Sequence, residues 1–314
     1  MKIAILGGGS WGTALAVHLA KNNHEVKMWE FFAEQAEKMQ NERLCPLLPG
    51  AKLNENIFVS SNMEEVLTNS ELVLLVVPSD KAELTLQSAQ PYLTTQDIVI
   101  CSKGFANDLR LISDVVKEKV SGNVYCLYGP THAEEVCKGM FSGIVLAGSE
   151  NQKKIKTVFE NESFKVDLSD DLIGVQVAAA LKNILAVFIG VLDGMGLGDN
   201  AKAYVMTKGL AEIKQVGLKW GAKEETFYGL AGVGDMIVTC TSEHSRNRFA
   251  GKEVGKGRKL DEVIKEMNMV AEGVNTAKLV PELINKFDLQ IPLLKGLHEI
   301  LFDEKDPKEI LKEL

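Results

Sequence analysis

The sequence predicts a doubly wound α/β domain with a mainly parallel sheet, followed by an all-helical domain. Its 314 residues fit two domains of about 150 residues each. Short β-rich apolar runs alternate with helical patterns through the first half, and helical periods dominate the second half. The pattern changes around residues 166–171, so we place the first domain at residues 1–168 and the second at residues 169–314.

The predicted strands are short runs of β-branched and other apolar residues. The run at 72–77, LVLLVV, is apolar at every position, which is typical of a strand buried on both faces of a parallel sheet. Amphipathic stretches between the runs, such as 13–22 and 81–89, predict helices that cover the sheet. In chain order, we predict strands at residues 3–6, 26–29, 57–59, 72–77, 98–101, 124–127 and 144–146.

The most apolar segment of the second domain, residues 175–192, predicts a long buried helix. Ser169 or Asp170 is suited to cap the start of this helix. Gln176, Lys182 and Asn183 interrupt the segment, whereas a spanning helix needs about 20 mostly apolar residues, so we predict no membrane span. Glycine-rich breaks at 193–199 and 229–235 separate the helices that follow.

A glycine-rich loop lies between the first predicted strand and the first predicted helix. Gly7, Gly9 and Gly12 have the G-x-G-x-x-G spacing of the dinucleotide-binding fingerprint. In this fingerprint the first glycine allows a tight turn, the second the close approach of a pyrophosphate, and the third the packing of helix against strand. The loop therefore predicts a Rossmann-type domain that binds NAD or NADP at a helix N-terminus. The alternative is a glycine-rich turn without a ligand.

An acidic residue, Glu30, ends the second predicted strand. A carboxylate at this place accepts hydrogen bonds from the adenosine ribose in Rossmann-type domains. Phe31 and Phe32 follow it and carry no positive charge for the 2′-phosphate of NADP. We therefore assign these three residues to the cofactor site and expect a weak preference for NAD. The alternative for Glu30 is a solvated residue at a strand end.

Lys182 lies in the middle of the long apolar helix. Burial disfavours the ammonium form and lowers a lysine pKa toward neutrality, where a proton donor or acceptor works best. Lys182 is therefore our candidate for proton transfer. The alternative is a structural ion pair, or a buried stem with an ammonium group that reaches water.

Further candidate residues follow the predicted strands or lie in a polar triplet of the second domain. Lys103 and Gly129 come just after the strands at 98–101 and 124–127, and open α/β sheets bind ligands at the carboxyl ends of strands. The triplet 245–247, Ser-Arg-Asn, places a guanidinium between two hydrogen-bonding side chains, which suits a phosphate group. For Lys103 and for the arginine of the triplet, the alternative is an exposed charge without a ligand.

Composition excludes several other functions. Lys and Arg number 35 against 43 Asp and Glu, and the net charge of -8 argues against nucleic acid as a partner. The five cysteines are scattered without a CxxC pair, so we predict no disulfide framework and no metal site. Free thiols suit a reducing cytosol, and the apolar start at residues 3–6 is too short for a signal peptide. We expect a cytoplasmic protein.

Several segments match one known family in order and spacing, over essentially the whole chain. They are GGGSWGTAL at 7–15, SKGF at 102–105, GPTHAEEV at 129–136, ALKNI at 180–184, GMGLGDNAK at 194–202, GVGDMIVTCT at 232–241, SRN at 245–247 and VAEG at 270–273. Together they resemble the soluble NAD(P)-dependent glycerol-3-phosphate dehydrogenase family. Many bacterial members carry a basic or His-Arg pair after the second strand, where this chain has Phe31 and Phe32.

The resemblance implies a role for each matching residue. Lys182 would be the catalytic proton carrier, with Asp235 beside it and Lys103 as a second positive group. The substrate would be held by these residues together with Gly129, Thr131, Ser245, Arg246 and Asn247, the last three at its phosphate end. Besides the residues already named, the cofactor would be bordered by Ser10, Trp11, Lys103, Ala133, Arg246, Val270 and Glu272.

The expected reaction is reversible hydride transfer between NAD(P)H and dihydroxyacetone phosphate, which gives sn-glycerol 3-phosphate for glycerophospholipid synthesis. The expected partner is thus a small molecule, and the sequence is compatible with a homodimer. One alternative is a related two-domain reductase of a β-hydroxy acid or a 2-oxo acid. Another is a dinucleotide-binding sensor or scaffold, against which a lysine in an apolar helix argues because its burial is costly.

Overall fold

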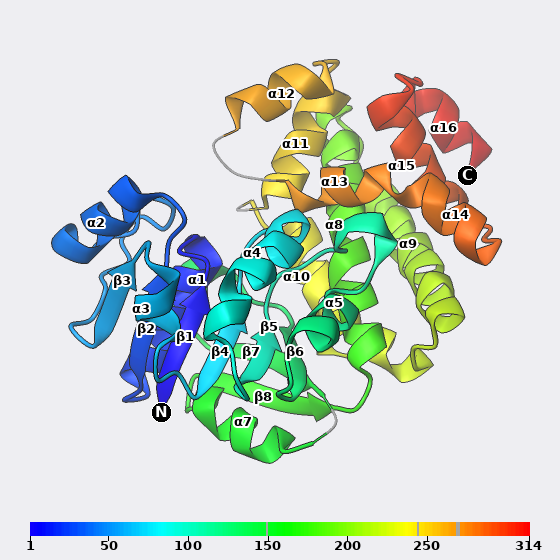
Figure 1. The fold of residues 1–314 in the computed structure, drawn as a ribbon. Helices are drawn as coiled ribbons and strands as arrows, with labels where there is room; N and C mark the ends of the chain where they lie inside the picture. The colour runs from blue at the N-terminus through cyan, green and yellow to red at the C-terminus, as the bar shows by residue number, and fades with distance from the viewer. Residues whose placement is uncertain (149, 244, 268–270) are drawn as a thin grey trace. The chain divides into compact units, whose positions relative to one another are not determined.

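The computed structural model describes residues 1–148, 150–243, 245–267 and 271–314, which form two compact units (Figure 1). The sheet unit comprises Met1–Ser102 and Ala106–Leu172, and the helical unit comprises Lys103–Phe105 and Ile173–Leu314. The predicted fold class is confirmed, because a largely parallel sheet with helices is followed by helices alone. The predicted boundary at 168/169 falls inside the last strand of the sheet unit.

The sheet unit contains an eight-stranded sheet with the order β3-β2-β1-β4-β5-β6-β7-β8. β6 and β7 are antiparallel, and the other neighbours are parallel. The chain order reverses between β1 and β4, and doubly wound sheets bind ligands beyond the carboxyl ends of their strands at such a point. The strands are β1 (Lys2–Leu6), β2 (Glu25–Trp29), β3 (Ile57–Ser60), β4 (Leu72–Leu75), β5 (Asp97–Ile100), β6 (Val124–Tyr128), β7 (Ser142–Ala147) and β8 (Phe164–Ser169).

The sequence pattern does not predict β8, which lies at one edge of the sheet. Its residues Phe164 and Val166 are buried, whereas Lys165 and Asp167, which alternate with them, are exposed. An edge strand with one exposed face lacks the continuous apolar run by which the other strands are found. Its pairing with β7 therefore becomes visible only in the folded chain.

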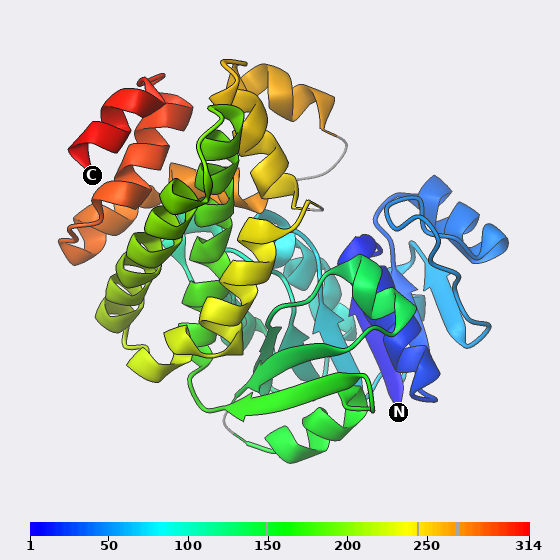
Figure 2. The same ribbon diagram turned by 180° about the vertical axis from the view of Figure 1, so that it is seen from behind.

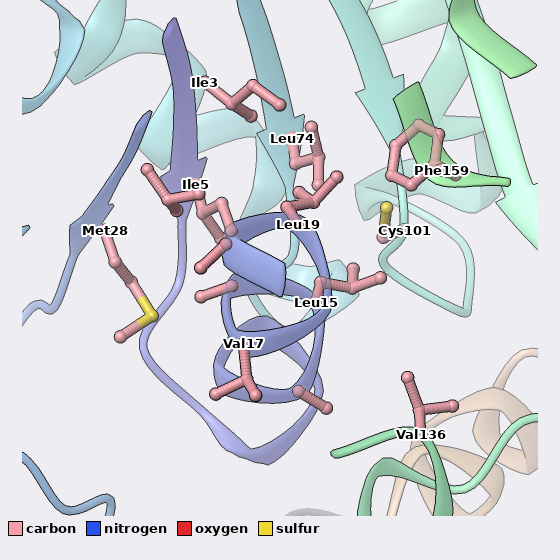
Figure 3. Packing of buried hydrophobic residues seen from close by; sticks show 14 of the residues in the cluster. Ile3, Ile5, Leu15, Val17, Leu19, Met28, Leu74, Cys101, Val136 and Phe159 are labelled. Carbon is pink, nitrogen blue, oxygen red and sulfur yellow. The ribbon is translucent and has the colours of Figure 1, made fainter. Parts of the chain in front are cut away.

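The helix of the first βαβ unit packs tightly against the sheet. Leu15 and Leu19 of α1 (Ser10–Lys21) are fully buried and pack in one cluster with Ile5 and Leu74 of the strands (Figure 3). This packing fixes the N-terminus of α1 beyond the end of β1. The other helices of the unit are α2 (Ala33–Glu42), α3 (Met63–Leu67), α4 (Ala82–Ala89), α5 (Ile112–Lys119), α6 (Ala133–Lys138) and α7 (Gln152–Phe159).

The core of the helical unit is α8 (Leu172–Gly194; Figure 2). Every residue from Gly174 to Leu192 in this helix is buried. The prediction of a long buried helix is thus confirmed. By length and composition α8 could cross a membrane, but 89% of its most apolar window is buried inside the protein, as in a core helix. The later helices are α9 (Asp199–Trp220), α10 (Asp235–Thr241), α11 (Arg246–Gly255), α12 (Leu260–Glu266), α13 (Glu272–Lys278), α14 (Val280–Phe287), α15 (Pro292–Phe302) and α16 (Pro307–Glu313).

Glycines bring α8 and α11 into contact through their backbones. A Cβ on Gly190 of α8 would overlap the carbonyl oxygen of Arg248, and a Cβ on Gly251 of α11 would overlap the carbonyl oxygen of Val187. The two helices can approach this closely only because neither position carries a side chain. The contact fixes α11, whose start carries the predicted phosphate-binding triplet, against the helix that carries Lys182.

We expect Gly251→Ala to lower the free energy of unfolding by about 1–3 kcal/mol, because the added methyl group forces the two backbones apart. Urea denaturation of the purified variant measures this loss. Gly198→Ala is the matched control, since no described atom lies within 4 Å of a Cβ at Gly198. Equal losses of stability in the two variants would contradict the close contact between α8 and α11.

Candidate active site

The glycine-rich loop leads from β1 into α1 in the sheet unit. Gly7 has a φ of +127°, which residues with side chains rarely adopt. A Cβ on Gly12 would overlap the carbonyl oxygen of Gly7, so only glycine allows the helix to start this close to the turn. By contrast, no described atom lies within 4 Å of a Cβ position on Gly9. The loop is thus tight at its two ends and open in its middle.

The start of α1 is suited to an anion. Gly9 is the N-cap residue and has no side chain that could accept hydrogen bonds from the first turn of the helix. The indole Nε1 of Trp11 is buried, and no hydrogen-bond acceptor for it is found among the described residues. An acceptor brought by a ligand would satisfy this donor. The loop therefore fits the phosphates of a dinucleotide.

Glu30 follows β2 directly, and its side chain is buried at 6% exposure. Its Oε1 accepts a hydrogen bond from the backbone N–H of Phe32 at 3.1 Å, and its carboxylate lies against Gly8 of the glycine-rich loop. Burial raises the pKa of Glu30, and hydrogen bonds from the following backbone oppose this shift. The structure thus contradicts the alternative of a solvated glutamate.

The two phenylalanines after Glu30 are strongly exposed. Phe31 and Phe32 are 68% and 64% exposed, and their rings meet edge to face with centroids 5.1 Å apart. Both rings precede α2 and carry no charge. They present an apolar surface next to the buried carboxylate of Glu30.

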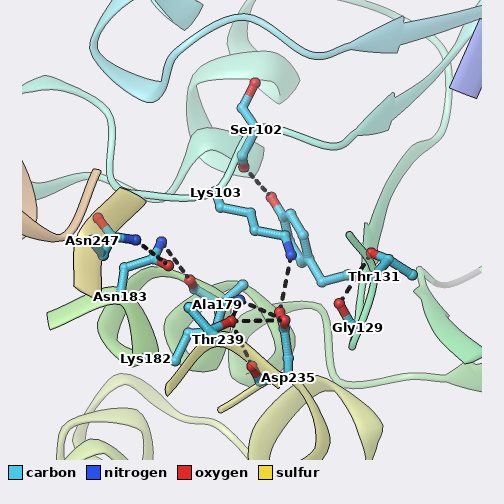
Figure 4. A network of polar contacts seen from close by, with 11 residues as sticks. Ser102, Lys103, Gly129, Thr131, Ala179, Lys182, Asn183, Asp235, Thr239 and Asn247 are labelled. Carbon is cyan, nitrogen blue, oxygen red and sulfur yellow. Dashed lines mark hydrogen bonds and ion pairs between the residues drawn. The ribbon is translucent and has the colours of Figure 1, made fainter. Parts of the chain in front are cut away.

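Lys103, Lys182 and Asp235 come together in the helical unit (Figure 4). The Nζ of Lys182 donates to Oδ1 of Asp235 at 2.5 Å, and the Nζ of Lys103 donates to Oδ2 at 3.1 Å. Lys182 and Asp235 are only 4% and 0% exposed, whereas the side chain of Lys103 is 19% exposed. One buried carboxylate is therefore shared by two ammonium groups, one on each oxygen.

The positions of Lys182 and Asp235 in their helices explain why these side chains are in contact. Lys182 projects from the middle of α8, and Asp235 is the first residue of α10. The predicted glycine-rich break before α10 is a π-helical turn, Leu230–Gly234, in which a Cβ on Gly232 would overlap the carbonyl oxygen of Phe227. Such turns occur often at functional sites.

Burial and charge act on Lys182 in opposite directions. Burial is the largest effect and lowers the pKa of Lys182 to about 7, while the Asp235 carboxylate raises it and the Lys103 ammonium lowers it further. Near neutral pH, Lys182 can therefore both give and take a proton. The ion pair between Lys182 and Asp235 agrees with the structural role considered for this lysine as well as with a catalytic role.

Thr239 completes this cluster and is missed by the sequence analysis. Its hydroxyl accepts a hydrogen bond from the Nζ of Lys182 at 2.5 Å and donates to the backbone carbonyl of Asp235 at 2.7 Å. The signal is its spacing, because residues four apart lie on the same face of a helix. Thr239 thus fixes the direction in which the Lys182 ammonium points.

Asn247 is held by two other helices. Its Nδ2 donates to Oδ1 of Asn183 at 3.1 Å (Figure 4). Its Oδ1 accepts from the backbone N–H of Gly273 at 2.9 Å. Asn183, the neighbour of Lys182, is therefore a second residue that the site assignment from sequence omits, although a polar residue in an apolar helix is a signal. Asn247 links α8 to the start of α13, where Glu272 lies.

The remaining predicted residues lie at the ends of elements. Ser245 is the N-cap of α11 and accepts a hydrogen bond from the backbone N–H of Arg248, and Arg246 is the exposed first residue of this helix. In the sheet unit, Gly129 follows β6 and its carbonyl accepts from the Thr131 hydroxyl, while Ala133 begins α6 and Ser10 begins α1. Val270 lies outside the described residues.

Comparison with known families and proteins gives matches over both units. Residues 2–154 match the model of the NAD-dependent glycerol-3-phosphate dehydrogenase N-terminus, and residues 171–312 match that of the C-terminus. Glycerol-3-phosphate dehydrogenase [NAD(P)+] of Agathobacter rectalis is 40% identical, with 100% of this chain and 95% of that protein covered. The protein of the same name from Geobacillus thermodenitrificans is 43% identical, with 99% and 94% covered.

A solved structure agrees with these matches. The crystal structure of glycerol-3-phosphate dehydrogenase from Coxiella burnetii has a TM-score of 0.96 to this chain at 33% identity, with 99% of this chain and 98% of that chain covered. Family models, relatives and structure all extend over the glycine-rich loop and the lysine cluster. The chain therefore belongs to the glycerol-3-phosphate dehydrogenase family.

Proposed function

We propose that this chain is an NAD(P)-dependent glycerol-3-phosphate dehydrogenase, which transfers a hydride reversibly between NAD(P)H and dihydroxyacetone phosphate to give sn-glycerol 3-phosphate. The observation that carries the proposal is the pair of lysines on the buried carboxylate of Asp235. Members of the same family carry the activity in their names. The product of the reduction is a phosphorylated alcohol that can serve glycerophospholipid synthesis.

Lys182 is the proposed proton carrier. During reduction, the new C–H bond forms at C2 and the electron pair of the C2=O double bond moves onto the oxygen. The Lys182 ammonium stabilises this negative charge and donates its proton to the oxygen, which leaves a neutral amine. In the reverse direction the neutral amine removes the proton of the hydroxyl group. When bound, the nicotinamide supplies or accepts the hydride.

Asp235 and Lys103 prepare Lys182 for this role. Asp235 orients the Lys182 ammonium and limits the fall of its pKa, since a buried opposite charge favours the charged form. Lys103 adds a second positive charge for the C2 oxygen, because its Nζ lies on the other oxygen of the same carboxylate. Thr239 adds a second fixed contact on the Lys182 ammonium. The four side chains thus form one hydrogen-bonded cluster that holds the Lys182 ammonium in place.

The start of α11 is the proposed phosphate site. Arg246 offers a fork of N–H donors, and Ser245 and Asn247 flank it with neutral groups. Asn247 is well suited to a fixed contact because two helices hold its amide in one orientation. We also assign Gly129 and Thr131 to the substrate, on the strength of the family resemblance.

The glycine-rich loop is the proposed site of the pyrophosphate, through Gly7, Gly9, Ser10, Trp11 and Gly12. Glu30 supports a weak preference for NAD, because a buried carboxylate beside the loop repels the 2′-phosphate of NADP. Phe31 and Phe32 offer apolar rings, rather than cations, at the same place. We also assign Lys103, Ala133, Arg246, Val270 and Glu272 to the border of the cofactor.

The proposed compartment is the cytosol. The five cysteines, Cys45, Cys101, Cys126, Cys137 and Cys240, are all described residues and form no disulfide. Burial raises the pKa of Cys126, Cys137 and Cys240, so their thiols are weak nucleophiles. Thiols of this kind suit a reducing environment. The homodimer stays a prediction from the sequence.

The direct test follows NADH and NADPH absorbance with dihydroxyacetone phosphate, and with dihydroxyacetone as the unphosphorylated control. We expect turnover of the phosphorylated ketone, a kcat/KM lower by at least about tenfold for dihydroxyacetone because a charged phosphate contact is lost, and a lower KM for NADH than for NADPH. Faster turnover of a 2-oxo acid would favour the related class of reductases. A lower KM for NADPH would contradict the role given to Glu30.

We expect Lys182→Ala to reduce kcat/KM for dihydroxyacetone phosphate by about 10³-fold or more, because both the proton donor and its charge are lost. NADH binding, measured by fluorescence titration, should stay close to that of the parent protein. Lys208→Ala, which removes an exposed lysine of the same unit, is the matched control. A Lys182→Ala variant that keeps more than about a tenth of the kcat/KM would exclude Lys182 as the proton carrier.

The pH profile should follow the protonation of Lys182, whose pKa is about 7. Reduction needs the ammonium, so its kcat/KM should fall as the pH rises through that value, and oxidation needs the neutral amine, so its kcat/KM should fall as the pH drops through it. Asp235→Asn removes the group that raises the Lys182 pKa and should move both limbs to lower pH. Asp193→Asn, at an ion pair with Lys202, is the control. Unmoved limbs in Asp235→Asn would contradict this assignment.

A further inference from the structure

The segment Lys103–Phe105 belongs to the helical unit although both of its chain neighbours belong to the sheet unit. We infer that Phe105 and Trp220 are positioning residues, which stack on each other and thereby hold Lys103 at Asp235. The inference rests on the proposed function, because it assigns a task to the contact between Lys103 and Asp235. It adds two aromatic residues to the set on which the reaction depends.

Phe105 is anchored by an aromatic stack. Its ring is nearly parallel to that of Trp220, at an interplanar angle of 10° and a centroid distance of 5.2 Å, and Phe105 is only 4% exposed. Trp220 is the last residue of α9, and its ring also contacts Phe287 at 5.0 Å and lies under the Lys286 ammonium at 4.7 Å. Contacts of this kind stabilise the position of a ring beyond the area that it buries.

The flanks of the segment are tied to the sheet unit. The Ser102 hydroxyl donates to the carbonyl of Val77 at 2.5 Å, and the Ser102 carbonyl accepts from the Tyr128 hydroxyl at 2.6 Å. On the other side, the N–H of Ala106 donates to the carbonyl of Arg110 at 2.9 Å. Gly104, with a φ of +144°, gives the turn between the two flanks. The segment is therefore a short loop with fixed ends.

Within this loop, the position of Phe105 limits the position of Lys103. The two residues are separated by one glycine, so their Cα atoms are at most about 7 Å apart, and a shift of the ring moves the lysine backbone with it. A long lysine side chain has many rotamers and loses this freedom when it is fixed in one geometry. A backbone held by the stack removes the further freedom of the loop, so that the ammonium stays on one carboxylate oxygen. Misplacement of a catalytic group by about 1 Å can cost 10²-fold in rate.

The position of Lys103 also acts on Lys182. The Lys103 ammonium lowers the pKa of Lys182, in the same direction as burial and against Asp235. If Lys103 moves away, the Lys182 pKa must rise. Loss of the stack should therefore leave a signature in the pH profile, which a simple loss of folded protein would not produce.

The test compares Trp220→Leu with Trp220→Phe in the full-length chain. We expect kcat/KM for dihydroxyacetone phosphate to fall about 10- to 100-fold in Trp220→Leu and by no more than about threefold in Trp220→Phe, which keeps an aromatic ring for the stack. Phe302→Leu removes a ring of α15 that contacts His298 and is the matched control. The alkaline limb of the reduction profile should move to higher pH in Trp220→Leu alone.

A double-mutant cycle with Lys103→Ala separates positioning from stability. Lys103→Ala alone should lower kcat/KM by about 10²- to 10³-fold, and Trp220→Leu should then add no more than about threefold, because the group that it positions is already gone. Additive losses would overturn the inference, and so would a normal kcat/KM in Trp220→Leu.

Failure of the positioning role and failure of the proposed function give different results. If Trp220→Leu does not fold, Phe105→Leu enters the same cycle and is judged by the same criteria. A wild-type chain that does not turn over dihydroxyacetone phosphate would overturn the proposed function itself. An active wild type with an unmoved pH limb in the stack variants would overturn only the positioning role.

Discussion

The arrangement of the helical unit depends on one buried carboxylate. Asp235 is fully buried, and a charge in that position is tolerated only when opposite charges and hydrogen bonds surround it. Removal of one partner from a buried ion pair typically costs about 3–5 kcal/mol. Lys182 on α8, Lys103 on its loop and the turn before α10 must therefore all reach their places together.

The charges of this cluster match what the proposed proton transfer requires. With both lysines protonated, the cluster carries a net positive charge, which complements an oxygen that becomes negative. Once Lys182 gives up its proton in the proposed mechanism, the cluster is neutral, and the burial of Lys182 no longer costs the free energy of a desolvated ammonium. The same burial that brings the Lys182 pKa near 7 thus favours release of the proton. The close contact of α8 with α11 extends this order to the start of α11, since glycines leave the two backbones little room to slide.

Those features of the fold and the site that a local pattern determines can be predicted from the sequence. A lysine in an apolar helix and a glycine-rich turn between strand and helix can be read directly, and both lie where they were expected. The burial of the Glu30 side chain could not be predicted, because the carboxylate occupies the space that a side chain at Gly8 would fill, and Gly8 lies in another part of the sequence. Thr239 could have been predicted, since it lies one helical turn after Asp235. Strand β8 could not, since its exposed polar residues resemble those of a loop. The membership of Lys103–Phe105 in the helical unit is a tertiary property that no window of sequence carries.

That membership matters for anyone who recombines this enzyme with its relatives. A chimera joined in the last strand or at the start of α8 would take the loop with Lys103 from one parent, and the tryptophan and aspartate that it meets from the other. The natural unit of exchange is discontinuous: the helical unit together with three residues from the middle of the sheet half. The same constraint acts on point substitutions, so we expect changes at the ring of Phe105 and at the ring of Trp220 to be better tolerated together than singly.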